Sequence, residues 1–378
     1  MQLSRRNFFR MLGAGAAVSA AQWPIRSLAS AAIFEPPRSG PGNAIRLNSN
    51  ENAYGSSMKV TYALQDALPA INRYPYMEYG DLAGAIAELH GVQREQVLLG
   101  CGSTEILRVA SETFGGPGRQ TVQASPTYES IGHYSQLAGS EVISVPLTAQ
   151  FAHDLDAMLA RIGPSTTLVY ICNPNNPTAS LTPRKDIETF LGKLPANCRL
   201  VIDEAYHHFV SSAAPYTSFL DQPIRDERVI VCRTFSKVFG LAGLRLGYAV
   251  AAKDLASRME PHITGDSVNA IATRVGAVAL KDTKGVEEAI KRNATARQFF
   301  LDQAKLRAVS AIDSQANFAM INAGRPVESA IAHFRDNNIL VGRKFPAMPT
   351  YLRVSFGKPD EMQAFWRTWD LLPAAKAA

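Results

Sequence analysis

The chain has 378 residues, of which 46% are hydrophobic and 19% are charged. This balance is typical of a globular protein that buries a large core, and it excludes disordered and fibrous classes. The formal net charge is +6, and most of it comes from a segment at the N-terminus.

Residues 1–31 differ in composition from the rest of the chain. They contain the letters SRRNFFR, a short apolar stretch that ends at Ala21, and alanine-rich sites of the kind that signal peptidase cuts. This pattern resembles a twin-arginine export signal. The apolar stretch is well short of the roughly 20 residues that a membrane-spanning helix needs, which favours a cleaved signal over an uncleaved anchor. We therefore expect a periplasmic or secreted protein.

Charge and cysteine content narrow the classes of partner. Residues 1–31 contain four arginines and no acidic residue, so their removal lowers the formal net charge to +2. A nucleic-acid partner is therefore not indicated. The four cysteines, at positions 101, 172, 198 and 232, form no C-x-x-C pair. Three of them lie in strand-like apolar runs, where we expect buried thiols, and we expect neither a metal site nor a disulfide framework.

Helical and strand patterns alternate from residue 80 to residue 255. The strand-like runs are apolar throughout, which is typical of a parallel sheet covered by helices on both faces. We predict an α/β fold in which this large domain holds a mostly parallel sheet. The expected helices are 81–91, 103–114, 129–139, 154–163 and 184–194, and the expected strands are 96–100, 120–125, 141–147, 166–172, 199–205, 228–235 and 244–251.

The two ends of the chain have a different character. Residues 32–79 are expected to form an N-terminal arm or linker, and residues 256–378 a smaller α+β domain. In the smaller domain the patterns predict helices at 268–282, 286–306, 327–338 and from about residue 361, with strands at 317–323, 339–344 and 351–357.

Open parallel sheets bind ligands at the carboxyl ends of their strands, where four polar loops are expected here. In the first, Gly102-Ser103-Thr104 opens a helix, so free backbone amides and two hydroxyls suit a phosphate. Taken alone, this loop is more often an ordinary helix cap. The second has the letters NPNNPT, in which prolines fix the loop around Asn173 and Asn176. A plain turn explains its prolines but not its second pair of asparagines.

The third loop presents an acid. Asp203 ends an apolar strand and is followed by Tyr206. An unpaired carboxylate at such a place is costly, so we expect Asp203 to have a cationic partner.

The fourth loop supplies hydroxyls and cations. It carries Thr234, Ser236 and Lys237, and Arg245 begins the next strand. Alone, it fits a solvated basic loop equally well. Together, however, the four loops offer an amine, a phosphate cradle, a buried acid for a ring nitrogen, and an amide with a phenol for a ring oxygen. That combination is what a pyridoxal phosphate site requires.

Several longer motifs stand in one order along the chain. They are LNSNENAYG, NPNNPT, DEAY, RTFSKVFGLAGLRLGYA, SQANF and YLRVSFG, between Leu47 and Gly357. In these motifs the chain resembles fold type I pyridoxal-phosphate-dependent enzymes of the class I/II aminotransferase family, and within them the histidinol-phosphate aminotransferase group. The resemblance implies a large domain with a seven-stranded-type sheet. It also implies transfer of an amino group between an amino acid and a 2-oxo acid in a ping-pong cycle.

The resemblance also implies roles for the cofactor-binding residues. Lys237 would bond covalently to the cofactor and later move a proton between the substrate Cα and the cofactor. Asp203 would pair with the pyridine nitrogen, Asn176 and Tyr206 would hydrogen-bond the ring oxygen, and Tyr128 would stack on the ring. The phosphate would be held by Gly102, Ser103, Thr104, Thr234, Ser236 and Arg245.

The same resemblance suggests substrate-binding residues and a dimer. Arg353 matches the arginine that takes the substrate's carboxylate through a bidentate pair, and Arg343 and Asn317 are further candidates near that pocket. Tyr54 would reach in from a neighbouring subunit, which implies a homodimer with shared active sites.

The chain departs from the family pattern at three places. Ala53 stands where the family has proline and Ala179 where it has glycine, and we expect both changes to alter loop stiffness. Residues 339–355 differ from histidinol-phosphate aminotransferases in a region that shapes substrate choice. Export also argues against histidinol phosphate, because that compound belongs to cytoplasmic synthesis.

Two alternatives stay open. A related decarboxylase or lyase would share every cofactor contact, since such enzymes differ in which Cα bond is broken. A non-catalytic pyridoxal-phosphate-binding protein is a further alternative. The presence of Lys237, Asp203 and Arg353 together counts against it, because binding alone needs neither the amine nor the acid.

Overall fold

The computed structural model describes residues 44–221 and 226–373. These residues all belong to one compact unit of the chain, Glu35–Ala378. The export signal expected at residues 1–31 lies outside the described residues.

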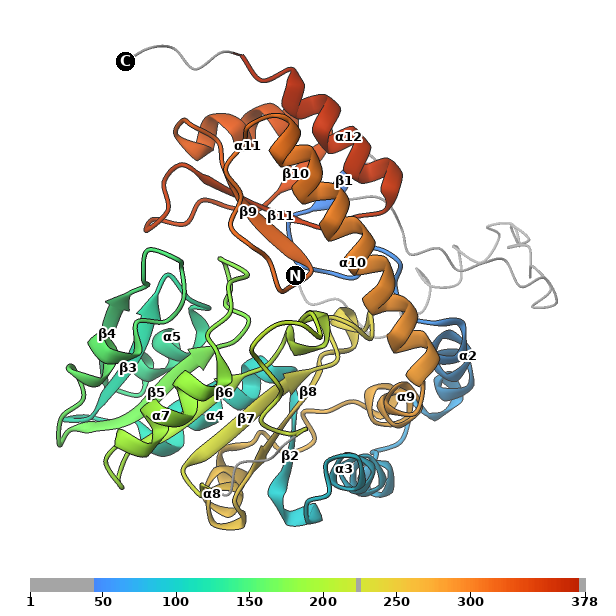
Figure 1. Ribbon diagram of the computed structural model, residues 1–378. Helices are drawn as coiled ribbons and strands as arrows, with labels where there is room; N and C mark the ends of the chain where they lie inside the picture. Colours follow the sequence, from blue (N-terminus) through green and yellow to red (C-terminus); the bar gives the residue numbers. More distant parts are fainter. Residues whose placement is uncertain (1–43, 222–225, 374–378) are drawn as a thin grey trace, which may run out of the picture. The chain divides into compact units, whose positions relative to one another are not determined.

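A seven-stranded sheet has the order β2-β8-β7-β6-β5-β3-β4 (Figure 1). Neighbouring strands from β4 to β7 are parallel, whereas β8 runs antiparallel to both β7 and β2. The predicted α/β fold with a mostly parallel sheet is therefore confirmed. The strands are β2 (Val97–Cys101), β3 (Gln120–Ser125), β4 (Glu141–Pro146), β5 (Thr166–Cys172), β6 (Arg199–Asp203), β7 (Val229–Thr234) and β8 (Leu246–Ala251).

The central strands are buried on both faces. In β5, Leu168 and Tyr170 belong to one hydrophobic cluster, while Val169 and Ile171 belong to another. Successive side chains of a strand point to opposite faces, so each face of the sheet has its own core. The helices α4 (Ser103–Phe114), α5 (Ser130–Leu137) and α8 (Lys253–Met259) contribute to the first cluster, and α2 (Met58–Ala67), α3 (Tyr76–His90), α6 (Leu155–Leu159), α7 (Arg184–Lys193) and α9 (Ala270–Leu280) to the second.

Local signals in the sequence account for several helix ends. Helix α3 ends at Gly91, whose φ of 61° is the left-handed conformation that glycine adopts without strain. Helix α9 begins after Asn269, whose side chain accepts a hydrogen bond from the backbone of Ala272. These caps satisfy backbone groups that the helix itself leaves unpaired.

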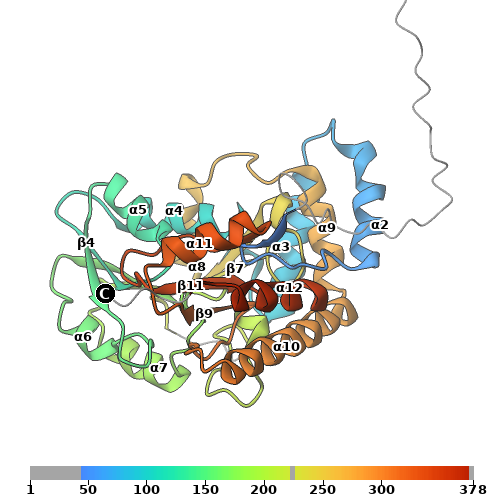
Figure 2. The ribbon, with the colours of Figure 1, turned by 90° about the horizontal axis from the view of Figure 1, so that it is seen from above.

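The C-terminal part has a separate core. Antiparallel β9 (Phe318–Asn322) and β11 (Tyr351–Ser355) form one small sheet, and β1 (Ile45–Leu47) pairs in parallel with β10 (Ile339–Val341). Helices α10 (Thr283–Leu306), α11 (Val327–Asp336) and α12 (Pro359–Asp370) supply residues to the cluster around these strands (Figure 2). Strand β1 thus brings residues 45–47 beside the C-terminal strands. The domain boundaries given above stay a prediction.

Two kinds of feature are absent from residues 44–221 and 226–373. No helix there is long and apolar enough to cross a membrane. The same residues contain no group of three or more histidine, cysteine or acidic side chains placed to hold a metal ion.

Candidate active site

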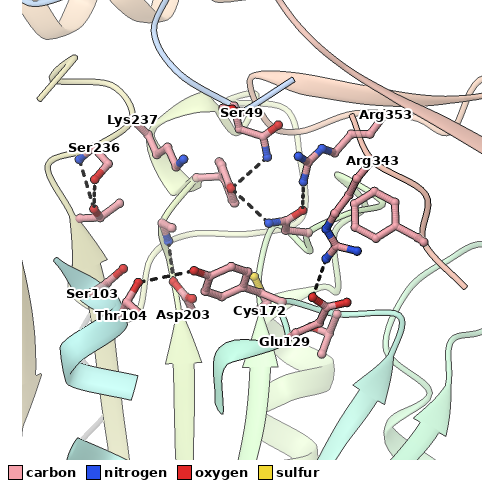
Figure 3. Close-up of a pocket in the computed structure, with 18 of the residues that line it drawn as sticks. Ser49, Ser103, Thr104, Glu129, Cys172, Asp203, Ser236, Lys237, Arg343 and Arg353 are labelled. Carbon is pink, nitrogen blue, oxygen red and sulfur yellow. Dashed lines mark hydrogen bonds and ion pairs between the residues drawn. The ribbon is translucent and has the colours of Figure 1, made fainter. Parts of the chain in front are cut away.

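Loops at the ends of strands of the seven-stranded sheet and loops beside β1, β10 and β11 line a cavity of about 280 Å³ (Figure 3). Strand β8 runs antiparallel to β7, so its first residues lie at the same sheet edge as the carboxyl ends of the parallel strands. This explains why Arg245, which precedes β8, faces loops that follow other strands. Twelve of the residues singled out in the sequence line the cavity: Ser103, Thr104, Tyr128, Asn176, Asp203, Tyr206, Thr234, Ser236, Lys237, Arg245, Arg343 and Arg353.

Three of the singled-out residues do not line it. Gly102 lies directly beneath the guanidinium of Arg245. The Asn317 amide donates hydrogen bonds to the carbonyls of Asn50 (3.0 Å) and Glu51 (3.2 Å), so Asn317 supports the cavity wall from behind. Tyr54 lies outside the cavity of its own chain, with the guanidinium carbon of Arg292 4.5 Å from its ring centre.

Lys237 carries a partly buried amine with both cations and carboxylates nearby. Burial and the nearby guanidinium of Arg353 lower the pKa of Lys237 to about 8, although Glu51 and Asp203 oppose this shift. A lysine with such a pKa is partly neutral near neutral pH. It can therefore act as a nucleophile and accept a proton.

Asp203 forms the floor of the cavity at the end of β6. Its side chain is 2% exposed, and burial raises the pKa of the carboxyl to about 6. One carboxylate oxygen accepts a hydrogen bond from the Tyr170 hydroxyl at 2.9 Å, and the other accepts one from the backbone of Ala205 at 3.1 Å. These bonds hold the carboxyl in place, and a cation placed against it would favour its ionised form.

Asn176 connects the phenol side of the cavity with Arg353. The Asn176 carbonyl accepts a hydrogen bond from Arg353 Nη1 at 2.8 Å, and its amide lies 3.5 Å from the Tyr206 hydroxyl. The same hydroxyl accepts a hydrogen bond from Asn50 at 3.1 Å. Arg353 Nη2 donates to the carbonyl of Asn48, while its Nε is buried and has no hydrogen-bond partner among the described residues. This Nε lies against Gly342 and is closed to solvent, whereas Nη1 and Nη2 each carry a second N–H that can bind an anion in the cavity.

Several hydroxyl groups and the Arg245 guanidinium lie at the end of the cavity opposite Arg353. Arg245 Nη1 donates to the Ser236 hydroxyl at 3.3 Å, and the Thr234 hydroxyl lies 3.0 Å from that of Ser236. Ser103 and Thr104 open helix α4 at the same place. Free backbone amides at a helix N-terminus, hydroxyls and an arginine are the donors that a phosphate prefers.

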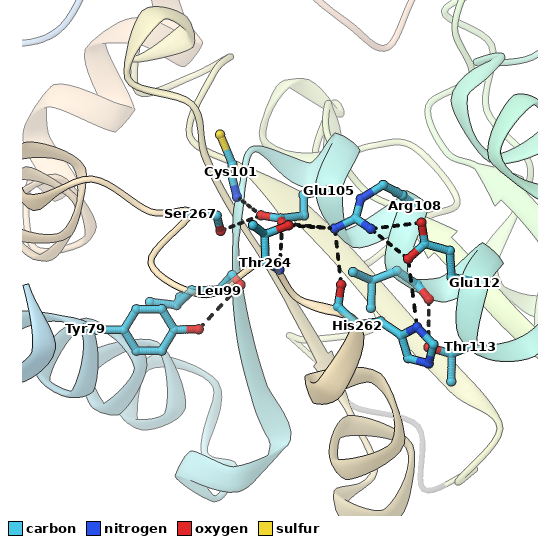
Figure 4. Close-up of polar contacts among 11 residues, drawn as sticks. Tyr79, Leu99, Cys101, Glu105, Arg108, Glu112, Thr113, His262, Thr264 and Ser267 are labelled. Atoms are coloured by element: carbon cyan, nitrogen blue, oxygen red, sulfur yellow. Dashed lines mark hydrogen bonds and ion pairs between the residues drawn. The ribbon is translucent and has the colours of Figure 1, made fainter.

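A polar network fixes the start of α4 (Figure 4). Glu105, in the first turn, accepts hydrogen bonds from the backbone of Cys101 at 2.6 Å and from the Ser267 hydroxyl at 2.7 Å. Burial alone would raise the pKa of Glu105, but these bonds and those from Thr264 outweigh it, and the pKa is lowered. Glu105 does not line the cavity, so it anchors the loop before α4 from outside it.

The donor set fits pyridoxal phosphate. Gly102 has a φ of 76°, and a Cβ at this position would stand 2.2 Å from Arg245 Nη2, so only glycine leaves this cradle open. The cradle suits the phosphate, Asp203 the ring nitrogen and Lys237 the aldehyde carbon. Asn176 and Tyr206 lie on the side that suits the ring oxygen. Each part of the cofactor thus has a chemically matched group in one cavity.

Sequence reasoning missed several cavity residues. Ser49 and Asn50 follow β1, Glu129 follows Tyr128, and Phe345 follows β10. Asn50 is buried and has a φ of 52°, a conformation that asparagine tolerates better than most residues. The letters NSNEN contained this signal, but only their neighbour Tyr54 was singled out.

One departure from the family pattern has a visible consequence. Ala179 is fully buried and has a φ of 59°. A left-handed alanine costs about 1 kcal/mol relative to glycine. The loop therefore keeps the backbone path that a glycine would favour, at some strain.

Comparison with known proteins agrees with this geometry. Residues 42–367 match the family model of aminotransferase class I and II. A histidinol-phosphate aminotransferase of Moorella thermoacetica is 34% identical over 330 residues, which cover 87% of this chain and 85% of that protein.

Solved structures agree as well. The crystal structure of a protein from Erwinia carotovora atroseptica has a TM-score of 0.84 and 32% identity, covering 87% of this chain and 96% of that one. The histidinol-phosphate aminotransferase of Sinorhizobium meliloti, solved in complex with pyridoxal-5'-phosphate, has a TM-score of 0.81 and 25% identity, covering 92% of this chain and 100% of that one. The present chain belongs to the aminotransferase class I and II family and is a pyridoxal-phosphate-dependent aminotransferase.

Proposed function

We propose that this aminotransferase acts on α-amino acids and 2-oxo acids, as an exported homodimer. The observation that carries the substrate class is the position of Arg353. Its guanidinium lines the same cavity as Lys237, is oriented by Asn176 and the carbonyl of Asn48, and has a second N–H on each of Nη1 and Nη2. A substrate carboxylate in the cavity can accept hydrogen bonds from these N–H groups.

The cofactor, when bound, supplies an electron sink that weakens the bonds at the substrate Cα. Lys237 supplies the base: because burial and Arg353 lower the pKa of its amine to about 8, Nζ can take the Cα proton near neutral pH. Arg353 fixes the carboxylate and thereby limits which Cα bond faces Lys237.

The other cavity residues would hold the cofactor in one orientation. Asp203 would keep the ring nitrogen protonated, because its ionised carboxyl attracts that proton. Ser236, Arg245 and the amides at the start of α4 would bind the phosphate. Tyr128, whose hydroxyl lies 3.4 Å from that of Thr104, would cover the ring.

A homodimer is supported by the apolar surface of the segment that follows Tyr54. Monomeric proteins rarely expose many large apolar side chains in one short segment. The exposed ones here are Met58, Tyr62, Leu68, Ile71, Tyr74, Tyr76 and Met77. In the proposed dimer this segment is covered, and Tyr54 reaches the partner's phosphate site rather than its own.

Histidinol phosphate is a second candidate substrate, favoured by the names of the relatives. Arg353 would then hold a phosphate in place of a carboxylate. Residues 1–31 resemble an export signal. This supports an amino acid as the substrate, because histidinol phosphate is a cytoplasmic intermediate. A decarboxylase or lyase would give carbon dioxide or ammonia without converting an added 2-oxo acid.

The substrate proposal is tested by product analysis. The purified protein is given a panel of amino acids and histidinol phosphate, each with 2-oxoglutarate or pyruvate, and new amino acids are quantified. We expect transfer from α-amino acids, with Arg353→Gln raising KM for them at least about tenfold through loss of a charge-assisted pair. Exclusive use of histidinol phosphate, or release of carbon dioxide without transfer, would contradict the proposal.

Cell fractionation with an intact or an Arg5→Lys/Arg6→Lys signal tests export, and sedimentation of the mature chain tests the dimer.

A further inference from the structure

A carboxylate that the account above does not use lines the cavity. Glu129, between β3 and α5, forms an ion pair with Arg343, which follows β10 (Figure 3). The distance between Arg343 Nη2 and Glu129 Oε2 is 2.5 Å. The pair therefore joins a loop of the large sheet to a loop of the C-terminal strands across the cavity.

Arg343 lies next to the arginine assigned to the substrate carboxylate. The guanidinium carbon of Arg343 is 4.4 Å from the ring centre of Phe345, and that of Arg353 is 5.2 Å from the same centre. Two guanidinium groups thus share one aromatic ring. A substrate with two anionic groups could place one on Arg353 and the other on Arg343.

Glu129 competes for that second position. The other carboxylate in the cavity lining, Asp203, is buried and bonded to Tyr170, so it faces a different part of the cavity. The Glu129 carboxylate already pairs with the Arg343 guanidinium. A second substrate carboxylate can bind this guanidinium only by displacing Glu129. Two carboxylates around one exposed guanidinium also repel each other.

We propose that Glu129 determines specificity by occupying Arg343, so that the enzyme disfavours substrates with a second anionic group. Amino acids with uncharged side chains are then preferred over dicarboxylic ones. The inference rests on the proposed role of Arg353 as the site of the first carboxylate.

The solvent exposure of Glu129 and Arg343 limits how strongly their ion pair can affect substrate affinity. The side chains of Glu129 and Arg343 are 63% and 54% exposed, so solvent screens the pair. We expect removal of the Glu129 charge to change the affinity for a second carboxylate by about threefold to tenfold, not by orders of magnitude. The change should shrink as ionic strength rises.

The test compares the binding of two simple ligands by calorimetry. Succinate has two carboxylates and butyrate has one on a chain of equal length. Each is titrated into the cofactor-loaded wild type and into Glu129→Gln. The expected result is that Glu129→Gln binds succinate about threefold to tenfold more tightly while its affinity for butyrate stays unchanged.

Glu328→Gln is the matched control. Glu328 pairs with Lys344, the neighbour of Arg343, and has a similar exposure of 52%, but it does not line the cavity. The Glu328→Gln substitution removes one negative charge, as Glu129→Gln does, from a nearby part of the surface. An equal gain in succinate affinity in Glu328→Gln would mean that net charge alone acts, and would overturn the proposal.

A double variant separates occupation of Arg343 from simple repulsion by Glu129. In an Arg343→Gln background, Glu129→Gln should no longer improve succinate binding, because the position to be released is gone. A gain of the same size in that background would overturn the proposed pairing. An unchanged ratio of succinate to butyrate affinity in Glu129→Gln alone would overturn it as well.

Failure of the proposed function gives a different result. If Arg353 does not hold the first carboxylate, Arg353→Gln leaves butyrate binding unchanged, whatever Glu129 does. If Arg353→Gln weakens butyrate and Glu129→Gln leaves the ratio unaltered, only the inference about Glu129 fails. Steady-state kinetics give a second check: in Glu129→Gln, KM for dicarboxylic substrates should fall while kcat changes little, because the contact is remote from the reacting atoms.

Discussion

Arg245 and Gly102 approach so closely that a Cβ at position 102 would stand 2.2 Å from Arg245 Nη2. The two residues come from different loops at the same end of the site: Gly102 follows β2, and Arg245 precedes β8. They meet because β8 runs antiparallel to β2. The backbone of Gly102 and the guanidinium together form the cradle assigned to the cofactor phosphate.

Gly102→Ala is therefore expected to weaken cofactor binding. The new methyl group must push the end of the Arg245 side chain aside, and the backbone at φ 76° and ψ 162° is a conformation that only glycine adopts readily, which adds about 1–3 kcal/mol of strain. We expect the dissociation constant of pyridoxal phosphate to rise at least about tenfold, the loss expected for a displaced charge-assisted contact. Fluorescence titration of the apoprotein measures it.

Gly118→Ala is the control for an alanine at a positive φ. Gly118 has the same φ of 76°, but a Cβ there has no heavy atom within 4 Å. It should leave cofactor affinity unchanged. Equal losses of cofactor affinity in both variants would show that the contact with Arg245 does not matter.

The pKa of Lys237 predicts the pH dependence of cofactor capture. Burial and Arg353 lower this pKa to about 8, so the amine is protonated below that pH and neutral above it. Only the neutral amine attacks a carbonyl carbon. The rate at which apoprotein captures pyridoxal phosphate should thus rise with pH and level off above about pH 8. Stopped-flow absorbance measures this rate.

A variant of Arg353 tests whether this arginine lowers the pKa of Lys237. Arg353→Met removes a cation that disfavours the protonated amine, so the midpoint should move to higher pH. A rate that keeps rising to the ordinary pKa of a free lysine in the wild type would contradict the assignment.

Asp203→Asn tests the acid beneath the cavity. Asparagine has a similar shape, but it cannot supply the negative charge that keeps a ring nitrogen protonated. We expect kcat to fall by about 10² or more, as for other losses of a preorganised charge, with a nearly unchanged melting temperature. Asp336→Asn, which alters an exposed ion pair, should leave both unchanged. An unimpaired kcat in Asp203→Asn would remove the proposed contact with the ring nitrogen.

A buried ion pair lies next to the strands β6 and β7, which carry Asp203 and Thr234. Arg233 and Glu204 lie 3.1 Å apart with side chains 5% and 0% exposed, next in sequence to Thr234 and Asp203. Arg233→Met should lower the free energy of unfolding by about 3–5 kcal/mol, because Glu204 is left buried without its cation. Urea denaturation measures this loss.

Two comparisons make that prediction specific. Arg274→Met, which breaks a half-exposed pair with Glu78, should cost no more than about 1 kcal/mol. Replacing both members, as in Arg233→Met/Glu204→Met, should recover part of the stability, because no unpaired charge remains. A double variant less stable than Arg233→Met would contradict the explanation.

Much of the sheet could be predicted from the sequence. The runs 120–125 and 166–172 match β3 and β5, and the pattern at 103–114 matches α4. These segments have unambiguous periodicity and turn residues at their ends, so local sequence suffices. The direction of β8 could not be predicted, because an apolar run does not encode which way a strand points.

The cavity was predicted less completely, for a physical reason. Lys237 and Asp203 follow strands of the main sheet, so the rule that ligands bind at strand ends finds them. Asn50 and Phe345 reach the cavity only because β1 pairs with β10, a contact between residues almost 300 positions apart. Glu129 was missed because its partner, Arg343, lies 214 positions away. Such long-range pairings leave no local signal.

The most direct test of the account is the visible spectrum of the purified protein, read before and after amino acids and then 2-oxo acids are added. The account predicts a cofactor band that certain amino acids bleach and 2-oxo acids restore. In Lys237→Ala this response should be lost and turnover should fall at least about a hundredfold, while Lys344→Ala behaves as the wild type. No band even with added cofactor, or an unaltered response in Lys237→Ala, would contradict the claim that Lys237 is the reacting group of an aminotransferase.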